Sequence, residues 1–244
     1  PPASSPCLRF HDACRGLAVI AMLAANLVNV FMSHTPALLR HNEGDVLRLF
    51  DLPAPVFQFL IGVSLVLFLR RRRALGRTPG AARLDAVRRF TLLIGLGVLL
   101  DTVGIFGIGL RWGVLHTLGL GGIVATLVSP LSDAIVAAIA LFVLGVFSGV
   151  GHGEVHGGPG SALAFVPLTL AGCLVGRGLE EGQPLRAFVG RAVLVAIASL
   201  SVAIAIHGLG IPFNKLLGSS SFVALATAVS AGLGQKCIAI AWRC

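Results

Sequence analysis

Residues 40–62, RHNEGDVLRLFDLPAPVFQFLIG, pass from a polar loop that carries His41, through Asp51, into an apolar helix. On a helix that begins near Asp51, Gln58 and Gly62 lie within roughly 20° of Asp51, because 7 and 11 residues are close to whole helical turns. One face of this helix is therefore polar or small. The chain is poor in ionisable groups, so a histidine and a carboxylate beside an apolar helix are candidates for chemistry.

The composition of the whole chain is typical of a membrane protein. Of its 244 residues, 56% are hydrophobic and only 12% are charged, and the mean hydropathy is +0.92. A soluble domain carries about 25% charged residues. The long apolar runs predict an all-α, polytopic helical membrane protein with about eight transmembrane helices, forming a single domain over residues 1–244. We expect the membrane spans at about residues 13–33, 52–70, 88–107, 113–131, 132–149, 161–178, 188–208 and 219–240.

Basic residues between these spans predict the orientation in a plasma (inner) membrane. The arginine-rich segment between the second and third spans belongs in the cytoplasm by the positive-inside rule. Both termini are then cytoplasmic, and the His41 loop is extracytoplasmic. Of the 19 basic residues, this topology leaves only the following outside: Arg40, Arg48, Arg111 and Lys215. Topology thus accounts for the net charge of +9, so the lipid bilayer, and no nucleic acid, is the expected partner.

The cysteines and the last span add two expectations. All five cysteines fall in the inner half of the membrane or in the cytoplasm, so no structural disulfide is expected. Gln-Lys-Cys at residues 235–237 interrupts the last apolar run, as in a chain truncated at its C-terminus.

The first span carries polar residues at helical spacing. Asp12 and Arg15 are three residues apart and can pair on one helix face. Asn26 shares the face of Arg15 about 16 Å deeper. By themselves, these residues are explained without any function, by an ion pair at the membrane interface together with an amide bonded to a neighbouring helix.

The loop histidine is the strongest candidate for a general base. Histidine titrates near neutral pH, and a nearby carboxylate, either Asp45 or Asp51, could orient the His41 ring. The simpler alternative is a solvated histidine in a surface loop.

Further polar residues mark the starts of later spans. Arg111 and His116 indicate a polar site facing the bundle, or else a snorkelling arginine and a core histidine bonded to a backbone carbonyl. Asn214 and Lys215 lie at a helix entrance in the last outer loop. The histidines at 152 and 156 lie in a glycine-rich segment without the pattern of a zinc site, so no metal is expected.

Four motifs in this order resemble the transmembrane catalytic region of heparan-α-glucosaminide N-acetyltransferase and related bacterial membrane proteins. They are D-A-C-R-G at residues 12–16, D-x-x-x-P-x-F-x-F-x-x-G at 51–62, R-x-G-V-L-H at 111–116 and P-x-N-K-x-L-x-x-x-S-x-V at 212–223. The first is followed by Asn26 at the matching distance, and the second is preceded by His41. His116-Thr117 stands where the animal enzymes have Gln-Arg, which places the chain in the bacterial branch.

The resemblance implies an acyltransferase that moves an acetyl group from cytoplasmic acetyl-CoA to an amine or hydroxyl of an extracytoplasmic sugar or glycan. It implies His41 as the catalytic residue, with Asp51 and Asn26 in support. The other residues expected to bind substrate or acetyl-CoA are Asp12, Arg15, Arg111, His116, Asn214 and Lys215.

Two alternatives stay open at this point. One is a transporter or flippase for a polar or lipid-linked solute, although no inverted repeat is visible. The other is a non-catalytic membrane partner that shares only the fold. The sequence also leaves open the identity of the acceptor and whether the chain forms a homodimer.

Overall fold

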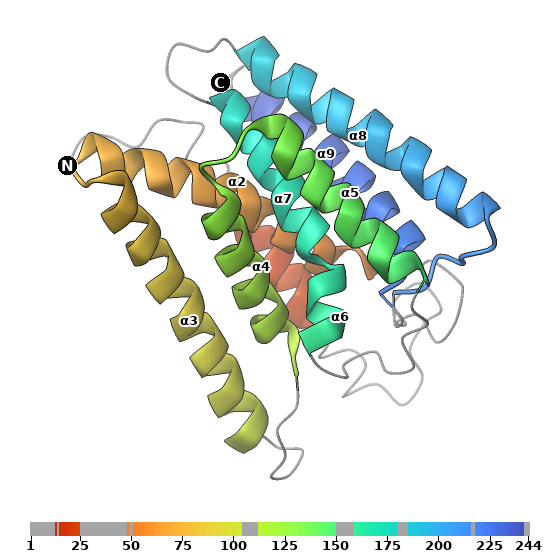
Figure 1. Ribbon diagram of the computed structural model, residues 1–244, viewed down its shortest axis with the longest axis horizontal. Coiled ribbons are helices and arrows are strands. Elements are labelled where there is room, and N and C mark those ends of the chain that lie inside the picture. The colour runs from red at the N-terminus through yellow and green to blue at the C-terminus, as the bar shows by residue number, and fades with distance from the viewer. Residues whose placement is uncertain are drawn as a thin grey trace.

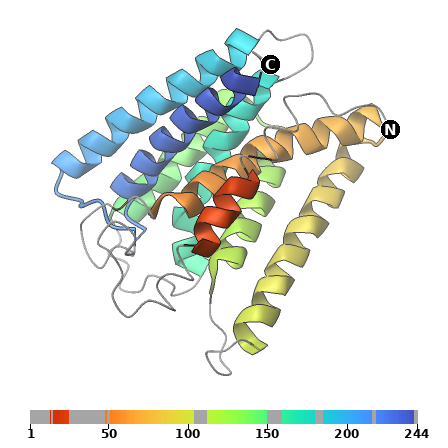
Figure 2. The same cartoon turned by 180° about the vertical axis from the view of Figure 1, so that it is seen from behind.

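The computed structural model describes residues 13, 15–24, 48, 51–103, 112–149, 159–179, 185–215 and 218–241, and every regular element in these ranges is helical. The predicted all-α fold is therefore confirmed. The helices are α2 (Pro53–Ala74), α3 (Pro79–Val103), α4 (Val114–Val128), α5 (Asp133–Gly149), α6 (Pro159–Ala164), α7 (Val166–Gly176), the 3-10 turn η2 (Arg177–Leu179), α8 (Leu185–Gly208) and α9 (Ser220–Ala241). A shorter helical run, Arg15–Ala24, lies beside α2 on the face shown in Figure 2.

Within the described ranges, three helical segments are long and apolar enough to cross a membrane: Pro53–Ala74, Ala162–Leu179 and Arg186–Gly208. Shorter apolar helices accompany them at Arg15–Ala24, Val114–Val128, Asp133–Phe147 and Ser220–Leu233. Figure 1 shows these helices as one bundle, with α7 near its middle and α3 and α8 on opposite flanks. The chain is a helical membrane protein, as its composition predicts.

The helix that contains the predicted third span begins nine residues before it, because α3 starts at Pro79 and the span was expected from residue 88. Thr78 caps this helix by accepting the backbone N–H of Ala81 at 3.3 Å, and Pro79 suits the first helical position. The end of α2 is equally sharp, since Gly76 adopts a φ of 80°, which only glycine adopts readily. The arginines expected in a loop therefore lie mostly on two helices.

The predicted sixth span is divided into α6 and α7 by a turn at Phe165. Pro167, two residues later, has no N–H to continue the helical hydrogen bonds. The two pieces together still form the apolar segment Ala162–Leu179. One predicted crossing is thus confirmed as a discontinuous helix.

The centre of the bundle is the contact between α2 and α7. A Cβ atom on Gly62 would lie 2.1 Å from the carbonyl oxygen of Thr169, and one on Gly172 would lie 2.0 Å from that of Phe59. The two backbones therefore meet at a distance that only glycine allows, as in other close helix pairs in membranes. Phe59, Leu168 and Phe222 pack around this contact in the apolar core.

The helix α8 forms the periphery. In the apolar segment of α7, 72% of the residues are buried inside the protein, against 11% for α8. Leu194, Ile197 and Ile204 of α8 are more than half exposed. An outer helix with such an apolar surface suits contact with lipid.

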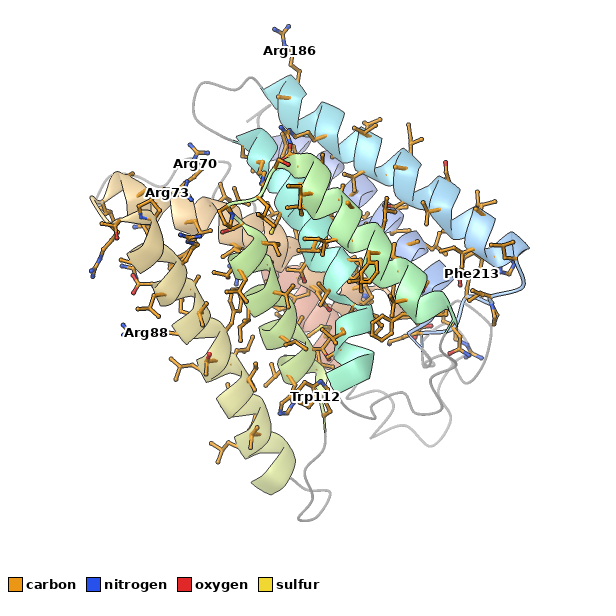
Figure 3. All side chains as sticks on the ribbon, in the orientation of Figure 1. Arg70, Arg73, Arg88, Trp112, Arg186 and Phe213 are labelled. Atoms are coloured by element: carbon orange, nitrogen blue, oxygen red, sulfur yellow. The ribbon has the colours of Figure 1, made fainter. Side chains whose placement is uncertain are left out.

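The bundle has two chemically different ends. Figure 3 shows Arg70, Arg73 and Arg186 at one end, which we call the basic end, and Trp112 and Phe213 at the other. The entrance of α2 and the loop between α8 and α9 belong to this second end, which we call the distal end. Charged side chains cluster at both ends.

Candidate functional site

Asp51 lies at the entrance of α2, where the chain is held by two reciprocal hydrogen bonds. The Arg48 backbone N–H donates to Oδ2 of Asp51 at 3.1 Å, and the Asp51 backbone N–H donates to the Arg48 carbonyl at 3.1 Å. Pro53 then starts the helix, because its fixed φ suits the first turn. The Asp51 side chain is fully buried, with 0% exposure.

Lys215 provides the countercharge for this buried carboxylate. Its Nζ donates to Oδ1 of Asp51 at 3.1 Å, across 164 residues of sequence. A buried carboxylate needs a partner charge or hydrogen bonds to offset the loss of its hydration. Asp51 has both kinds of partner. Its pair with Lys215 also joins the entrance of α2 to the α8–α9 loop.

The α8–α9 loop that holds Lys215 is itself tied down by serines. The Asn214 backbone N–H donates to Ser219 Oγ at 3.0 Å, and the Ser219 N–H donates to the Asn214 carbonyl at 3.0 Å. The hydroxyls of Ser219 and Ser221 each donate to the Pro212 carbonyl at 2.7 Å. Asn214 is buried, and Lys215 is therefore presented from a fixed backbone.

The polar face predicted for α2 is confirmed, and most of it is used for helix packing. Gln58 is buried, and its Nε2 donates to the Phe165 carbonyl at 3.0 Å, at the turn between α6 and α7. Gly62 faces the backbone of Thr169. Only Asp51, at the end of this face, contributes a charged group to the distal end.

His116 is a buried residue at the start of α4. Its Nδ1 accepts the backbone N–H of Gly113 at 3.0 Å. The ring lies 5.0 Å from that of Trp112 between centroids. A Cβ atom on Gly97 would come within 3.0 Å of the His116 ring, so α3 packs closely against it. This arrangement caps α4 and fixes the ring.

Several expected site residues cannot be placed. His41, Asn26, Asp12 and Arg111 lie outside the described residues, and Arg15 begins the helical run Arg15–Ala24. Their expected roles stay predictions. The structure does bring Asp51 together with Lys215, and it places Asn214 in the same loop.

The basic end contains a charge network that the sequence analysis missed. Asp133, at the start of α5, pairs through one carboxylate oxygen with Arg177 and through the other with Arg191. Arg177 also donates to the Ser129 carbonyl at 3.0 Å. The sequence feature that could have indicated this network is an acidic residue at the start of one helix together with arginines on neighbouring helices. This network ties α5 to η2 and α8.

Arginines at the basic end also line a small pocket. Arg70, Arg73 and Arg177 surround it together with Ser129 and Cys173, and its volume is about 70 Å³. Sites for small molecules usually measure about 300–1,000 Å³. The pocket therefore suits a single anionic group and not a whole cofactor. Among the described residues, no three His, Cys, Asp or Glu side chains gather as they would around a metal ion.

An all-helical bundle with apolar spans and charged ends defines a polytopic membrane protein. Residues 8–153, more than half of the chain, match the family described as heparan-alpha-glucosaminide N-acetyltransferase, catalytic. The chain belongs to this family of membrane acetyltransferases. A comparison with curated proteins finds no match. The family match contains Asp51 and His116 and ends before Lys215, so the ion pair joins the matched region to the rest of the chain.

Proposed function

We propose that the chain moves an acetyl group from cytoplasmic acetyl-CoA to an amine or hydroxyl of an extracytoplasmic sugar or glycan. The observation that carries the proposal is the buried Asp51–Lys215 pair at the distal end. It fixes the entrance of α2, ten residues after His41, against the α8–α9 loop. A fixed start for the helix that follows His41 in the sequence is what positioning of an acceptor requires.

The donor would approach from the basic end. Under the positive-inside rule this end faces the cytoplasm of a bacterial inner membrane, where acetyl-CoA is made. Arginine suits phosphate because its planar group donates two parallel hydrogen bonds. Arg70 and Arg73, beside the 70 Å³ pocket, are the described side chains best placed to meet one phosphate of CoA.

The transfer step follows from the chemistry of a thioester. The imidazole of His41 takes a proton from the acceptor amine or hydroxyl, whose nitrogen or oxygen then attacks the thioester carbonyl carbon. The C–S bond breaks, and CoA leaves as a thiolate that takes up a proton. Direct transfer and transfer through acetylated His41 give the same net reaction. In either route Asp51 and Lys215 act by positioning the groups around His41.

Labelled acetyl-CoA supplied to membranes that contain the protein tests this proposal. His41→Ala is expected to lower acetyl transfer to a glucosamine-type acceptor by about 10²–10⁴-fold, the usual contribution of a general base. The matched control is His207→Ala, because His207 is an exposed histidine near the distal end, stacked on Phe213 at 4.3 Å. Full turnover in the His41 variant would contradict the mechanism.

A transporter or flippase is the second candidate, and one observation favours it. The break between α6 and α7 at Phe165 produces a discontinuous helix, a device that transporters use at their substrate sites. Solute uptake or lipid flipping by proteoliposomes that contain no CoA would support this alternative. Acetyl transfer that needs His41, with no such transport, would exclude it.

A further inference from the structure

A long groove lies on the outside of the bundle between α5 and α8. Its floor is formed by α7 and α9, and both outer helices pack on this floor. The groove has a volume of about 380 Å³. Small and apolar side chains line most of it, including Ala137, Leu141, Leu194 and Ala198.

The charged groups of the groove are at one end. Asp133 and Arg191 line it at the basic end, whereas Leu144 and Val202 line it deeper in the bundle. The distance from Arg191 to Val202 along α8 is about 16 Å, at 1.5 Å per residue. One leaflet is half of a hydrocarbon core of about 30 Å. With Arg191 placed at the membrane surface, a groove of this length would reach about the bilayer centre.

The mouth of the groove carries a net positive charge. Asp133 and Arg191 line the groove with one charge of each sign, and Arg177, which pairs with Asp133 beside the groove without lining it, adds a second positive charge. The Arg191 side chain is 39% exposed and can donate further hydrogen bonds. Arg186 projects outward from the start of the same helix (Figure 3). Phosphate is the anion that an arginine at a membrane surface most readily meets.

We propose that this groove binds one acyl chain of an anionic phospholipid from the leaflet at the basic end, with the lipid phosphate at Arg191. The acyl chain fills the space between α5 and α8, and the headgroup meets the excess positive charge. The arm of CoA fits this groove less well, because its amide groups would lack partners among apolar walls. The proposal does not depend on acetyl transfer.

Filling the groove tests the acyl-chain site. Native mass spectrometry of the detergent-solubilised protein, titrated with phosphatidylglycerol, measures retained lipid. Ala198→Trp fills the groove from an exposed position and is expected to weaken lipid retention at least tenfold. Ala205→Trp is the matched control, since Ala205 is exposed on α8 and does not line the groove. Equal retention by the two variants would overturn the proposal.

Removing the charge at the mouth tests the headgroup site. Arg191→Gln is expected to lower the affinity for phosphatidylglycerol about fivefold and to lower its advantage over phosphatidylcholine, as expected for one arginine near a membrane surface. Arg88→Gln removes the same charge from an exposed position on α3 and should leave both unchanged. Arg191→Lys should preserve most of the preference for phosphatidylglycerol over phosphatidylcholine. Equal binding of the two lipids by the unmodified protein, or displacement of the lipid by acetyl-CoA, would contradict this site.

Discussion

The two ends of the bundle hold acid–base pairs in different surroundings. At the distal end, the Asp51 side chain is 0% exposed and that of Lys215 is 22% exposed. At the basic end, Asp133 is 42% exposed and Arg191 is 39% exposed. Exposed pairs contribute about 0–1 kcal/mol, whereas breaking a buried pair costs about 3–5 kcal/mol because one charge is left without a partner. The distal end is therefore where loss of one charge should matter most.

Removal of Lys215 should have the largest effect. Lys215→Ala removes the Lys215 charge from the buried Asp51 carboxylate, and we expect a loss of about 3–5 kcal/mol in the free energy of unfolding. The fall in thermal unfolding temperature in detergent measures this loss. Acetyl transfer should fall with it, because the entrance of α2 is no longer fixed to the α8–α9 loop.

A double variant separates charge from packing. Asp51→Asn combined with Lys215→Met removes both charges, and most of the lost stability should return, since neither partner is left alone. Acetyl transfer should stay low if Asp51 and Lys215 position the catalytic loop. A double variant as unstable as Lys215→Ala would show that the pair's charges are not the cause.

Substitution of Gly62 should have an intermediate effect and should disturb both ends together. Gly62→Ala places a Cβ atom 2.1 Å from the Thr169 carbonyl, so α2 and α7 must separate. Overpacking of this kind costs about 1–3 kcal/mol. Because Asp51 lies just before α2 and Arg70 near its other end, we also expect weaker hydrogen bonds from Lys215 to Asp51 and from Arg70 to the Leu179 carbonyl.

The matched control is Gly145→Ala in α5, where no atom lies within 4 Å of the added Cβ. This variant should retain its stability in the same unfolding assay or gain slightly, because alanine is the better helix former. Equal losses for the two glycine variants would contradict the close packing of α2 on α7.

Substitution of Asp133 should have the smallest effect and should depend on salt. Asp133→Asn removes the half-exposed partner of Arg177 and Arg191, and we expect a loss of about 1 kcal/mol at low ionic strength. At about 1 M salt the Debye length is about 3 Å, and this loss should nearly vanish. The loss caused by Lys215→Ala should change little, since buried pairs are screened less. If the stability losses caused by Asp133→Asn and Lys215→Ala depended equally on salt, the two pairs would not differ in their screening by solvent.

Helical periodicity allowed the local features to be predicted. The spacing of Asp51, Gln58 and Gly62 predicted one polar or small face, and the structure confirms it because a helix fixes which residues share a face. The long apolar runs predicted membrane-spanning helices, because a helix of about 20 apolar residues is long enough to cross the hydrocarbon core. The signal Thr78-Pro79 would also have placed the start of α3 correctly, since threonine caps and proline begins helices.

Contacts between distant segments could not be derived from local pattern. The sequence offered Asp51 or Asp45 as the partner of His41, which stays a prediction, and it gave no sign that Asp51 would meet Lys215 and the Arg48 amide. Which carboxylate meets which lysine depends on how α2 and the α8–α9 loop pack, and that is decided by many contacts at once. The groove between α5 and α8 was equally inaccessible, because spacing within one helix says nothing of the gap beside it.

The turn between α2 and α3 has a consequence for how the chain enters a membrane. Only residues 75–78 separate the two helices, and Arg71 to Arg73 lie directly before them. Placing an arginine at the centre of a bilayer costs about 2.5–3.5 kcal/mol even on biological insertion scales. The tip of this helical hairpin should therefore never cross, and α2 and α3 should insert together with their tip held at the surface. This turn at the basic end would then set the orientation in which the following helices insert into the membrane.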